Sequence, residues 1–173
     1  MITEIAISED NEVEALLEMI RFDTTQLKLK DGSFVNARDH IRGKIVVLYF
    51  SASWCNPCRQ FTPLMKQLSE KIAETNQPIE VILVSKDYMR FQMEDYYEKA
   101  GFSFAVIPLK DPIIEKLMAA YNVAELPSCR VVDERGYLID SDARFKVEQY
   151  NREKRQITEL FDQWRHKQTA MCV

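Results

Sequence analysis

The stretch Ile45-Val46-Val47-Leu48-Tyr49-Phe50, followed shortly by Trp54-Cys55-Asn56-Pro57-Cys58, decides how this chain folds. The first part is an unbroken apolar run, which predicts a strand buried on both faces within a parallel or mixed sheet. The second part places a C-x-x-C pair where a helical pattern begins, so we expect Cys55 at the helix start and Cys58 one turn inside. Unpaired N–H groups and the positive end of the helix dipole favour a thiolate at that position. This layout is that of a dithiol redox centre.

The spacing of the two cysteines suits reversible disulfide chemistry. Two intervening residues let Cys58 reach Cys55 across one helical turn, so an internal disulfide closes and opens with little backbone movement. A free cysteine has a pKa of about 8.5, and centres of this kind fall to roughly 7, which raises the fraction of attacking thiolate. We therefore predict Cys55 as the attacking sulfur and Cys58 as the resolving one.

A structural zinc site is the alternative interpretation of C-x-x-C. Such a site normally adds a second Cys or His pair, and no such pair stands at ligand spacing elsewhere in the chain. The remaining cysteines and histidines are Cys129, Cys172, His40 and His166. Pro57, between the cysteines, also favours the redox interpretation. We expect no metal and no cofactor beyond the redox-active Cys55–Cys58 disulfide, since the chain shows no flavin or nicotinamide fingerprint.

Length and composition narrow the class of protein further. A chain of 173 residues fits one domain with a sizeable core, and 46% hydrophobic with 29% charged residues is typical of a globular protein. The net charge of -4 argues against nucleic acid as a partner. No apolar run is long enough for a membrane span, and no secretory signal is visible at the start. We expect a monomer in the cytosol, with the nucleus as an alternative. In such a reducing compartment a C-x-x-C is more often catalytic than a structural disulfide.

Hydrophobic periodicity predicts alternating strands and helices. In chain order we expect a short helix over 12–22, a hairpin over 27–35 turning at Asp31-Gly32, the central strand over 45–50, a helix after Cys58 with Pro63 inside, a strand over 79–85, a helix over 89–100, a helix over 111–121, a hairpin of 128–132 with 137–139, and one long closing helix carrying Val147 through Trp164.

This β-α-β then β-β-α order around a W-C-x-P-C motif is similar to the thioredoxin fold. The string Tyr49-Phe50-Ser51-Ala52-Ser53-Trp54-Cys55-Asn56-Pro57-Cys58-Arg59-Gln60-Phe61-Thr62-Pro63 resembles the tryparedoxin and nucleoredoxin branch. The resemblance implies an α/β thioredoxin fold, a central mixed β-sheet flanked by helices with an N-terminal helix and hairpin extension. We divide the chain into an N-terminal extension over 1–26, a thioredoxin-like domain over 27–168 and a flexible tail over 169–173.

The resemblance also implies an activity, the reduction of disulfide-containing protein substrates by Cys55 and Cys58, with an external dithiol reductant to recharge the pair. It further implies that Pro127 is a cis proline facing the dithiol, where the backbone before it pairs with an extended substrate segment. A trans proline that opens a strand is the alternative for Pro127. The alternative function is a redox-sensitive binding module acting on a signalling partner, and peroxide reduction by Cys55 is a third.

The residues beside the cysteines are expected to shape the site. Trp54 is expected to cover one flank of the disulfide. Asn56 replaces the proline usual in the branch and restores a backbone N–H beside the attacking sulfur. Arg59 either holds the thiolates by charge or is a solvated helix residue. The buried acid that thioredoxins proper carry on the central strand is absent. When Cys58 leaves during reduction of the disulfide, its proton must therefore come from water or another side chain.

Other residues with chemical potential are expected to be structural. Cys129 is interpreted as a small buried hydrophobe and Cys172 as an incidental thiol near the end of the chain. Tyr96 and Tyr97 are interpreted as packing residues in the helix after the second buried strand. His40 and His166 are assigned no chemistry.

Overall fold

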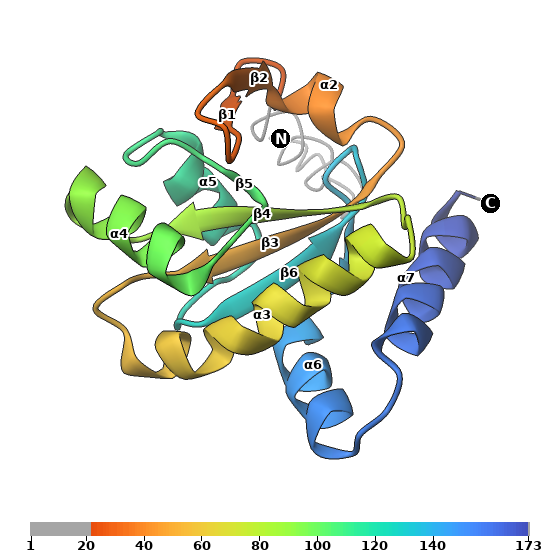
Figure 1. The fold of residues 1–173 in the computed structure, drawn as a ribbon. Helices are drawn as coiled ribbons and strands as arrows, with labels where there is room; N and C mark the ends of the chain where they lie inside the picture. The colour runs from red at the N-terminus through yellow and green to blue at the C-terminus, as the bar shows by residue number, and fades with distance from the viewer. Residues whose placement is uncertain (1–21, 173) are drawn as a thin grey trace, which may run out of the picture.

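The computed structural model describes residues 22–172 and shows one mixed seven-stranded sheet (Figure 1). The strands are β1 (Gln26–Lys28), β2 (Phe34–Asn36), β3 (Ile45–Ser51), β4 (Ile79–Ser85), β5 (Ala105–Val106), β6 (Ser128–Val132) and β7 (Leu138–Asp140). Their order across the sheet is β2-β1-β5-β4-β3-β6-β7, with β3, β4 and β5 parallel. Strand β1 is antiparallel to β5, and β6 is antiparallel to β3. The predicted mixed sheet and both predicted hairpins are confirmed.

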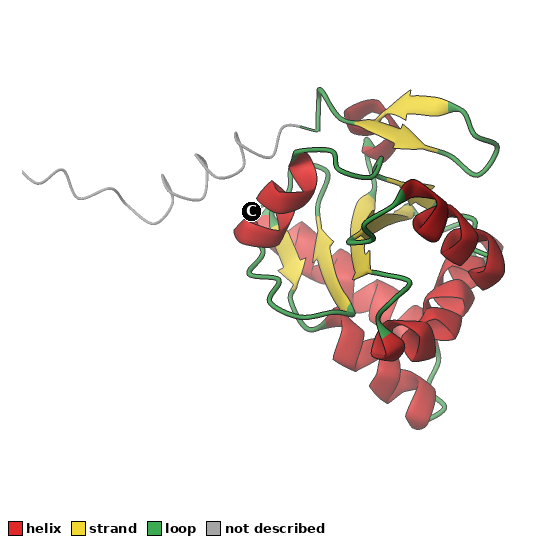
Figure 2. Ribbon diagram, turned by 90° about the vertical axis from the view of Figure 1, so that its left-hand side faces the viewer, coloured by secondary structure: helices red, strands yellow, loops and turns green. Residues whose placement is uncertain are grey.

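Helices cover both faces of this sheet (Figures 1 and 2). They are α2 (Ala37–Ile41), α3 (Asn56–Glu74), α4 (Arg90–Ala100), α5 (Ile113–Ala120), α6 (Ala143–Arg152) and α7 (Ile157–Met171). The helix predicted over 12–22 lies outside the described residues, apart from its last position. Within residues 22–172, no helix has both the length and the apolar character that a membrane span requires.

The central strand β3 supplies both halves of the core. Its seven residues are all buried, and successive side chains point to opposite faces. Ile45, Val47 and Tyr49 pack with α3, α4, α6 and α7. Their neighbours on the strand pack with α2 and α5 on the other face. Because both faces are buried, the strand reads as a continuous apolar run, and its carboxyl end delivers the C-x-x-C segment to one edge of the sheet.

The prediction of one long closing helix was wrong, because the chain forms two helices there. Helix α6 ends at Arg152 and α7 begins at Ile157. Between them, Lys154 adopts a left-handed conformation with φ 54°, and the Arg155 N–H bonds to the Tyr150 carbonyl. Both helices bury their apolar stripe in the same core, so the periodicity continues across the break. Helix α7 runs to Met171, so the first three residues of the predicted tail are helical.

A buried carboxylate joins β7 to the two closing helices. Asp140 is 4% exposed and accepts hydrogen bonds from Lys146 Nζ (2.7 Å), Trp164 Nε1 (2.8 Å) and the Asp142 N–H (2.9 Å). Burial by itself raises the pKa of Asp140, but the bonds from Lys146, Trp164 and Asp142 together lower it below its ordinary value. The folded chain therefore holds this group ionised more strongly than the unfolded chain does.

We expect this carboxylate to make the fold acid-sensitive. Because its folded pKa is lowered, its contribution to stability is complete above the ordinary value of 3.8 and is lost as the pH falls through the folded value. Urea unfolding between pH 7 and pH 2 measures the effect as a fall in the free energy of unfolding below the ordinary value of 3.8. Asp140→Asn should be less stable at pH 7 and should lose less stability on acidification. An equal acid dependence in both proteins would contradict this role for Asp140.

Candidate active site

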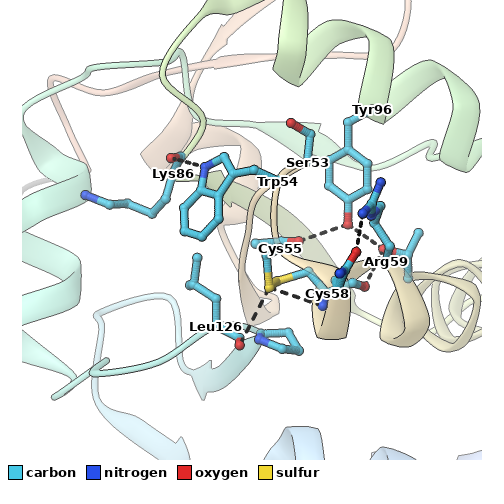
Figure 3. The surroundings of a disulfide bond; sticks show 12 residues. Ser53, Trp54, Cys55, Cys58, Arg59, Lys86, Tyr96 and Leu126 are labelled. Atoms are coloured by element: carbon cyan, nitrogen blue, oxygen red, sulfur yellow. Dashed lines mark hydrogen bonds between the residues drawn. A yellow bond between two sulfur atoms is a disulfide. The ribbon is translucent and has the colours of Figure 1, made fainter.

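The two cysteines of the motif lie at the N-terminus of α3 and are joined as a disulfide (Figure 3). Their Cα atoms are 5.2 Å apart, and Cys55 is the N-cap residue of the helix. Cys55 Sγ accepts the Cys58 N–H at 3.2 Å, a donor that has no partner within the helix itself. This N–H and the helix dipole both favour negative charge on the Cys55 sulfur.

The two sulfurs differ in access. Cys55 is 7% exposed and Cys58 is 0% exposed. A disulfide that approaches from solvent therefore meets Cys55, while Cys58 lies behind it at bonding distance. The dithiol is thus arranged for one sulfur to contact a partner and the other to act from within.

The loop before β6 brings a backbone carbonyl to the dithiol. The Leu126–Pro127 peptide bond is cis, as predicted. The Leu126 carbonyl oxygen lies 3.7 Å from Cys55 Sγ. When Cys55 is a thiol, it would donate a hydrogen bond to this oxygen. Leu126 also packs against the apolar surroundings of the two cysteines. The loop is thus the part of the site most distant in sequence, and it reaches the dithiol because β6 pairs with β3.

Trp54 forms the rim of the site on the β4 side (Figure 3). Its indole Nε1 donates to the Lys86 carbonyl at 3.2 Å, and its ring stacks on Tyr88 with centroids 5.9 Å apart. The side chain is 49% exposed, so Trp54 is a surface residue next to Cys55.

A buried aspartate that the sequence interpretation missed holds the loop before the cysteines. Asp87, only 6% exposed, accepts from the Ser53 N–H (2.9 Å), the Ser53 hydroxyl (2.5 Å) and the Ser85 hydroxyl (2.8 Å). All these partners lie at the carboxyl ends of β3 and β4. The available signal was an aspartate two residues after a buried strand, at the edge of the sheet where the dithiol is expected.

Asn56 and Arg59 form a pair on the outer side of the first turn. The Arg59 guanidinium donates to the Asn56 side-chain carbonyl, and both residues are exposed. Asn56, which stands where the branch usually has proline, therefore binds the Arg59 guanidinium of this turn. Of the two interpretations of Arg59, its position fits a solvated helix residue, and its hydrogen-bond partner is Asn56.

Beneath the dithiol, the central strand carries a phenol and no acid. Tyr49 Oη points at the Cys58 carbonyl (3.5 Å) and at Thr62 Oγ1 (3.3 Å). Burial raises the pKa of Tyr49 above its ordinary value, so the phenol stays protonated. Two further hydroxyls, those of Ser51 and Tyr96, join this cluster. Tyr96 packs as predicted, but its hydroxyl group is part of the site.

The remaining cysteines and histidines are not brought to the dithiol. Cys129 is buried on β6, where burial raises the pKa of its thiol, and Cys172 is exposed near the end of α7. His40 lies beside Glu80, and His166 bonds to the carbonyl of Asp162 on its own helix. In the part of the chain that the structure describes, no three His, Cys, Asp or Glu side chains gather as a metal site would require.

A mixed sheet with a C-x-x-C disulfide at the N-terminus of the helix after its central strand, and a cis proline opposite, defines the thioredoxin-like class. Residues 43–138 match the thioredoxin-like family model, and the chain belongs to this family.

Within the family, the chain is similar to nucleoredoxins and tryparedoxins. It is 31% identical over 136 residues to probable nucleoredoxin 1 of Arabidopsis thaliana, covering 79% of this chain and 23% of that protein. It is 35% identical over 106 residues to tryparedoxin of Trypanosoma brucei brucei, covering 61% of this chain and 72% of that protein. The crystal structure of a thioredoxin from Wuchereria bancrofti superposes with a TM-score of 0.68 at 30% identity, covering 83% of this chain and 95% of that one. The chain thus spans about a quarter of the length of the nucleoredoxins it matches.

Proposed function

We propose that this chain is a protein-disulfide reductase in which Cys55 attacks and Cys58 resolves. The observation that carries the proposal is the arrangement of the pair. Cys55, 7% exposed, is the more accessible of the two sulfurs and lies at a helix N-terminus with an N–H bond at 3.2 Å, and the fully buried Cys58 lies directly behind it. Membership of the thioredoxin-like family and similarity to tryparedoxin support the same reaction class.

The proposed reaction uses only the two cysteines. The Cys55 thiolate attacks one sulfur of a substrate disulfide, the substrate S–S bond breaks, and the released thiolate takes a proton from solvent. Cys58 then loses its proton to solvent, and its thiolate attacks the Cys55 sulfur. The mixed disulfide breaks, the second substrate thiolate leaves, and the Cys55–Cys58 disulfide forms. The substrate gains two electrons, and an external dithiol returns them to the enzyme. No bound cofactor takes part in this scheme.

The surroundings of Cys55 suit a polypeptide substrate. The Leu126 carbonyl stands beside the sulfur and offers an acceptor to a backbone N–H of an extended segment. Trp54 provides an exposed aromatic surface on the other side. We place the activity in the cytosol or nucleus, which stays a prediction from the sequence.

Reduction of insulin disulfides with a dithiol donor tests this function. The purified chain should accelerate precipitation of the insulin B chain well above the rate with donor alone. A wild-type protein that shows no acceleration, while its cysteines still cycle between thiol and disulfide, would contradict general reductase activity. The search would then turn to a partner whose binding depends on the redox state.

A further inference from the structure

Four buried hydroxyl groups form a cluster beneath the first turns of α3, which we name the hydroxyl brace. Its members are Tyr49, Ser51, Thr62 and Tyr96. Ser51 Oγ lies 2.9 Å from Tyr96 Oη, Tyr96 Oη is hydrogen-bonded to Thr62 Oγ1, and Thr62 Oγ1 donates to the Cys58 carbonyl at 2.8 Å. The brace thus connects β3 and α4 to the residue that carries the buried sulfur.

Counting protons gives the brace a direction. A hydroxyl has a single proton to donate. Thr62 gives its proton to the Cys58 carbonyl, so the bond between Tyr96 and Thr62 must be donated by Tyr96. Ser51 must then donate to Tyr96. Tyr96 is therefore the central member, because its hydroxyl accepts a hydrogen bond from Ser51 on β3 and donates one to Thr62 on α3.

The brace acts where α3 is weakest. Pro63 lies inside the helix, has no N–H to donate to the Arg59 carbonyl, and crowds that carbonyl with its ring. The helix therefore lacks one backbone bond in the turn directly after Cys58. Thr62, the residue before the proline, makes a side-chain bond to the Cys58 carbonyl in the same turn, which does not replace the bond missing at Arg59 but ties this turn to the brace. The Tyr96 hydroxyl is in turn hydrogen-bonded to the Thr62 hydroxyl that makes this bond.

Packing alone does not require the Tyr96 hydroxyl. Its ring contacts Phe102 edge-on at 5.8 Å, and these contacts would be kept by phenylalanine. The neighbouring Tyr97 also contacts Phe102 edge-on, and its hydroxyl donates to the Phe104 carbonyl at 2.6 Å, outside the brace. The helix therefore offers two adjacent tyrosines, each with a hydrogen-bonded hydroxyl, of which only one is connected to the dithiol turn.

We propose that Tyr96 is a positioning residue for Cys58, acting through Thr62 to hold the turn that aims the Cys58 sulfur at Cys55. This inference rests on the resolving role of Cys58 in the proposed function, but not on the identity of the substrate. The brace contacts the Cys58 carbonyl and no atom of Cys55, so attack by Cys55 should depend on it less than resolution by Cys58 does. Resolution depends on the placement of Cys58, and small displacements of reacting atoms are costly in rate.

A chromogenic aromatic disulfide, dithiobis-nitrobenzoate, separates the two steps. The reduced protein is used in a Cys172→Ser background, because Cys172 is an exposed thiol. Attack by Cys55 releases one aromatic thiolate and leaves a mixed disulfide. Cys58 then loses its proton to solvent, and its thiolate attacks the Cys55 sulfur. This attack releases the second aromatic thiolate. In Tyr96→Phe we expect the first release within about twofold of wild type and the second roughly tenfold slower, with the mixed disulfide accumulating by mass spectrometry.

Matched variants separate positioning from general loosening. Tyr97→Phe removes a hydroxyl from the same helix and should leave both releases unchanged. Thr62→Val should slow the second release as Tyr96→Phe does, and Thr62→Ser, which keeps the hydroxyl, should restore it. The proposal is overturned if Tyr96→Phe resolves at the wild-type rate, if Tyr97→Phe slows resolution equally, or if both releases slow together. A chain that fails to reduce insulin but shows two releases would refute the proposed function and leave this test intact.

Discussion

Replacing Cys58 by serine is expected to reduce turnover with protein disulfides severely and to leave the chain able to capture a substrate. Cys55 keeps its N-cap position and the N–H of residue 58, which is a backbone group that serine also provides. The first attack therefore proceeds, but no internal thiolate follows. Release then depends on external thiol, which lacks the high effective concentration of a group held in the site, so we expect turnover to fall roughly a hundredfold or more.

Insulin reduction and covalent capture measure the two halves of this prediction. Cys58→Ser should accumulate a mixed disulfide that survives denaturation and is released by reductant. Cys55→Ser should neither turn over nor capture, because the buried Cys58 is not reached from solvent. Cys172→Ser is the matched control and should keep full activity, since Cys172 lies at the end of α7. Turnover by Cys58→Ser at the wild-type rate would exclude Cys58 as the resolving residue.

Trp164→Ala is expected to cost about 3–5 kcal/mol of unfolding free energy, the usual range for removing a fully buried large aromatic residue. Trp164 is 0% exposed and packs against Phe161, with ring centroids 5.9 Å apart. Its indole N–H also satisfies the buried carboxylate of Asp140. The substitution therefore leaves a cavity between α7 and the sheet and removes one donor from a buried charge.

Urea unfolding followed by far-ultraviolet circular dichroism measures this loss without depending on tryptophan fluorescence. Trp54→Ala is the natural comparison, because it removes the other tryptophan from a half-exposed position. We expect that variant to lose at most about 1 kcal/mol, as is usual for surface substitutions. Equal losses in the two variants would show that α7 adds little to the core.

Much of the fold was predictable because its signals are local. The run from Ile45 to Phe50 predicted the central strand, and Asp31-Gly32 predicted the turn of the first hairpin, where Gly32 has φ 86°. The break between α6 and α7 was not predictable in this way. The apolar stripe shows no gap there, and the left-handed Lys154 is not a residue type that marks a turn.

The residues of the candidate site also divide into those that the sequence predicted and those that it did not. Cys55, Cys58 and Pro127 were found from the motif and the resemblance that it supports. Asp87, Ser51, Thr62 and Tyr96 were not, because each is an ordinary polar residue in a strand, helix or loop. Their partnership comes from the packing of α4 against α3 and from the pairing of β3 with β4.

The sequence by itself determined most of the sheet-forming strands, though not β5, and also the helix that begins at the dithiol and the identity of the two redox sulfurs, since these depend on residue type and spacing within short segments. Only the tertiary structure decided which of the two buried sulfurs keeps some contact with solvent, which carbonyl faces it, and which hydroxyls gather beneath the turn. Those properties depend on contacts between residues far apart in the chain, and a buried polar group finds its partner only where the packed elements place one within hydrogen-bond distance.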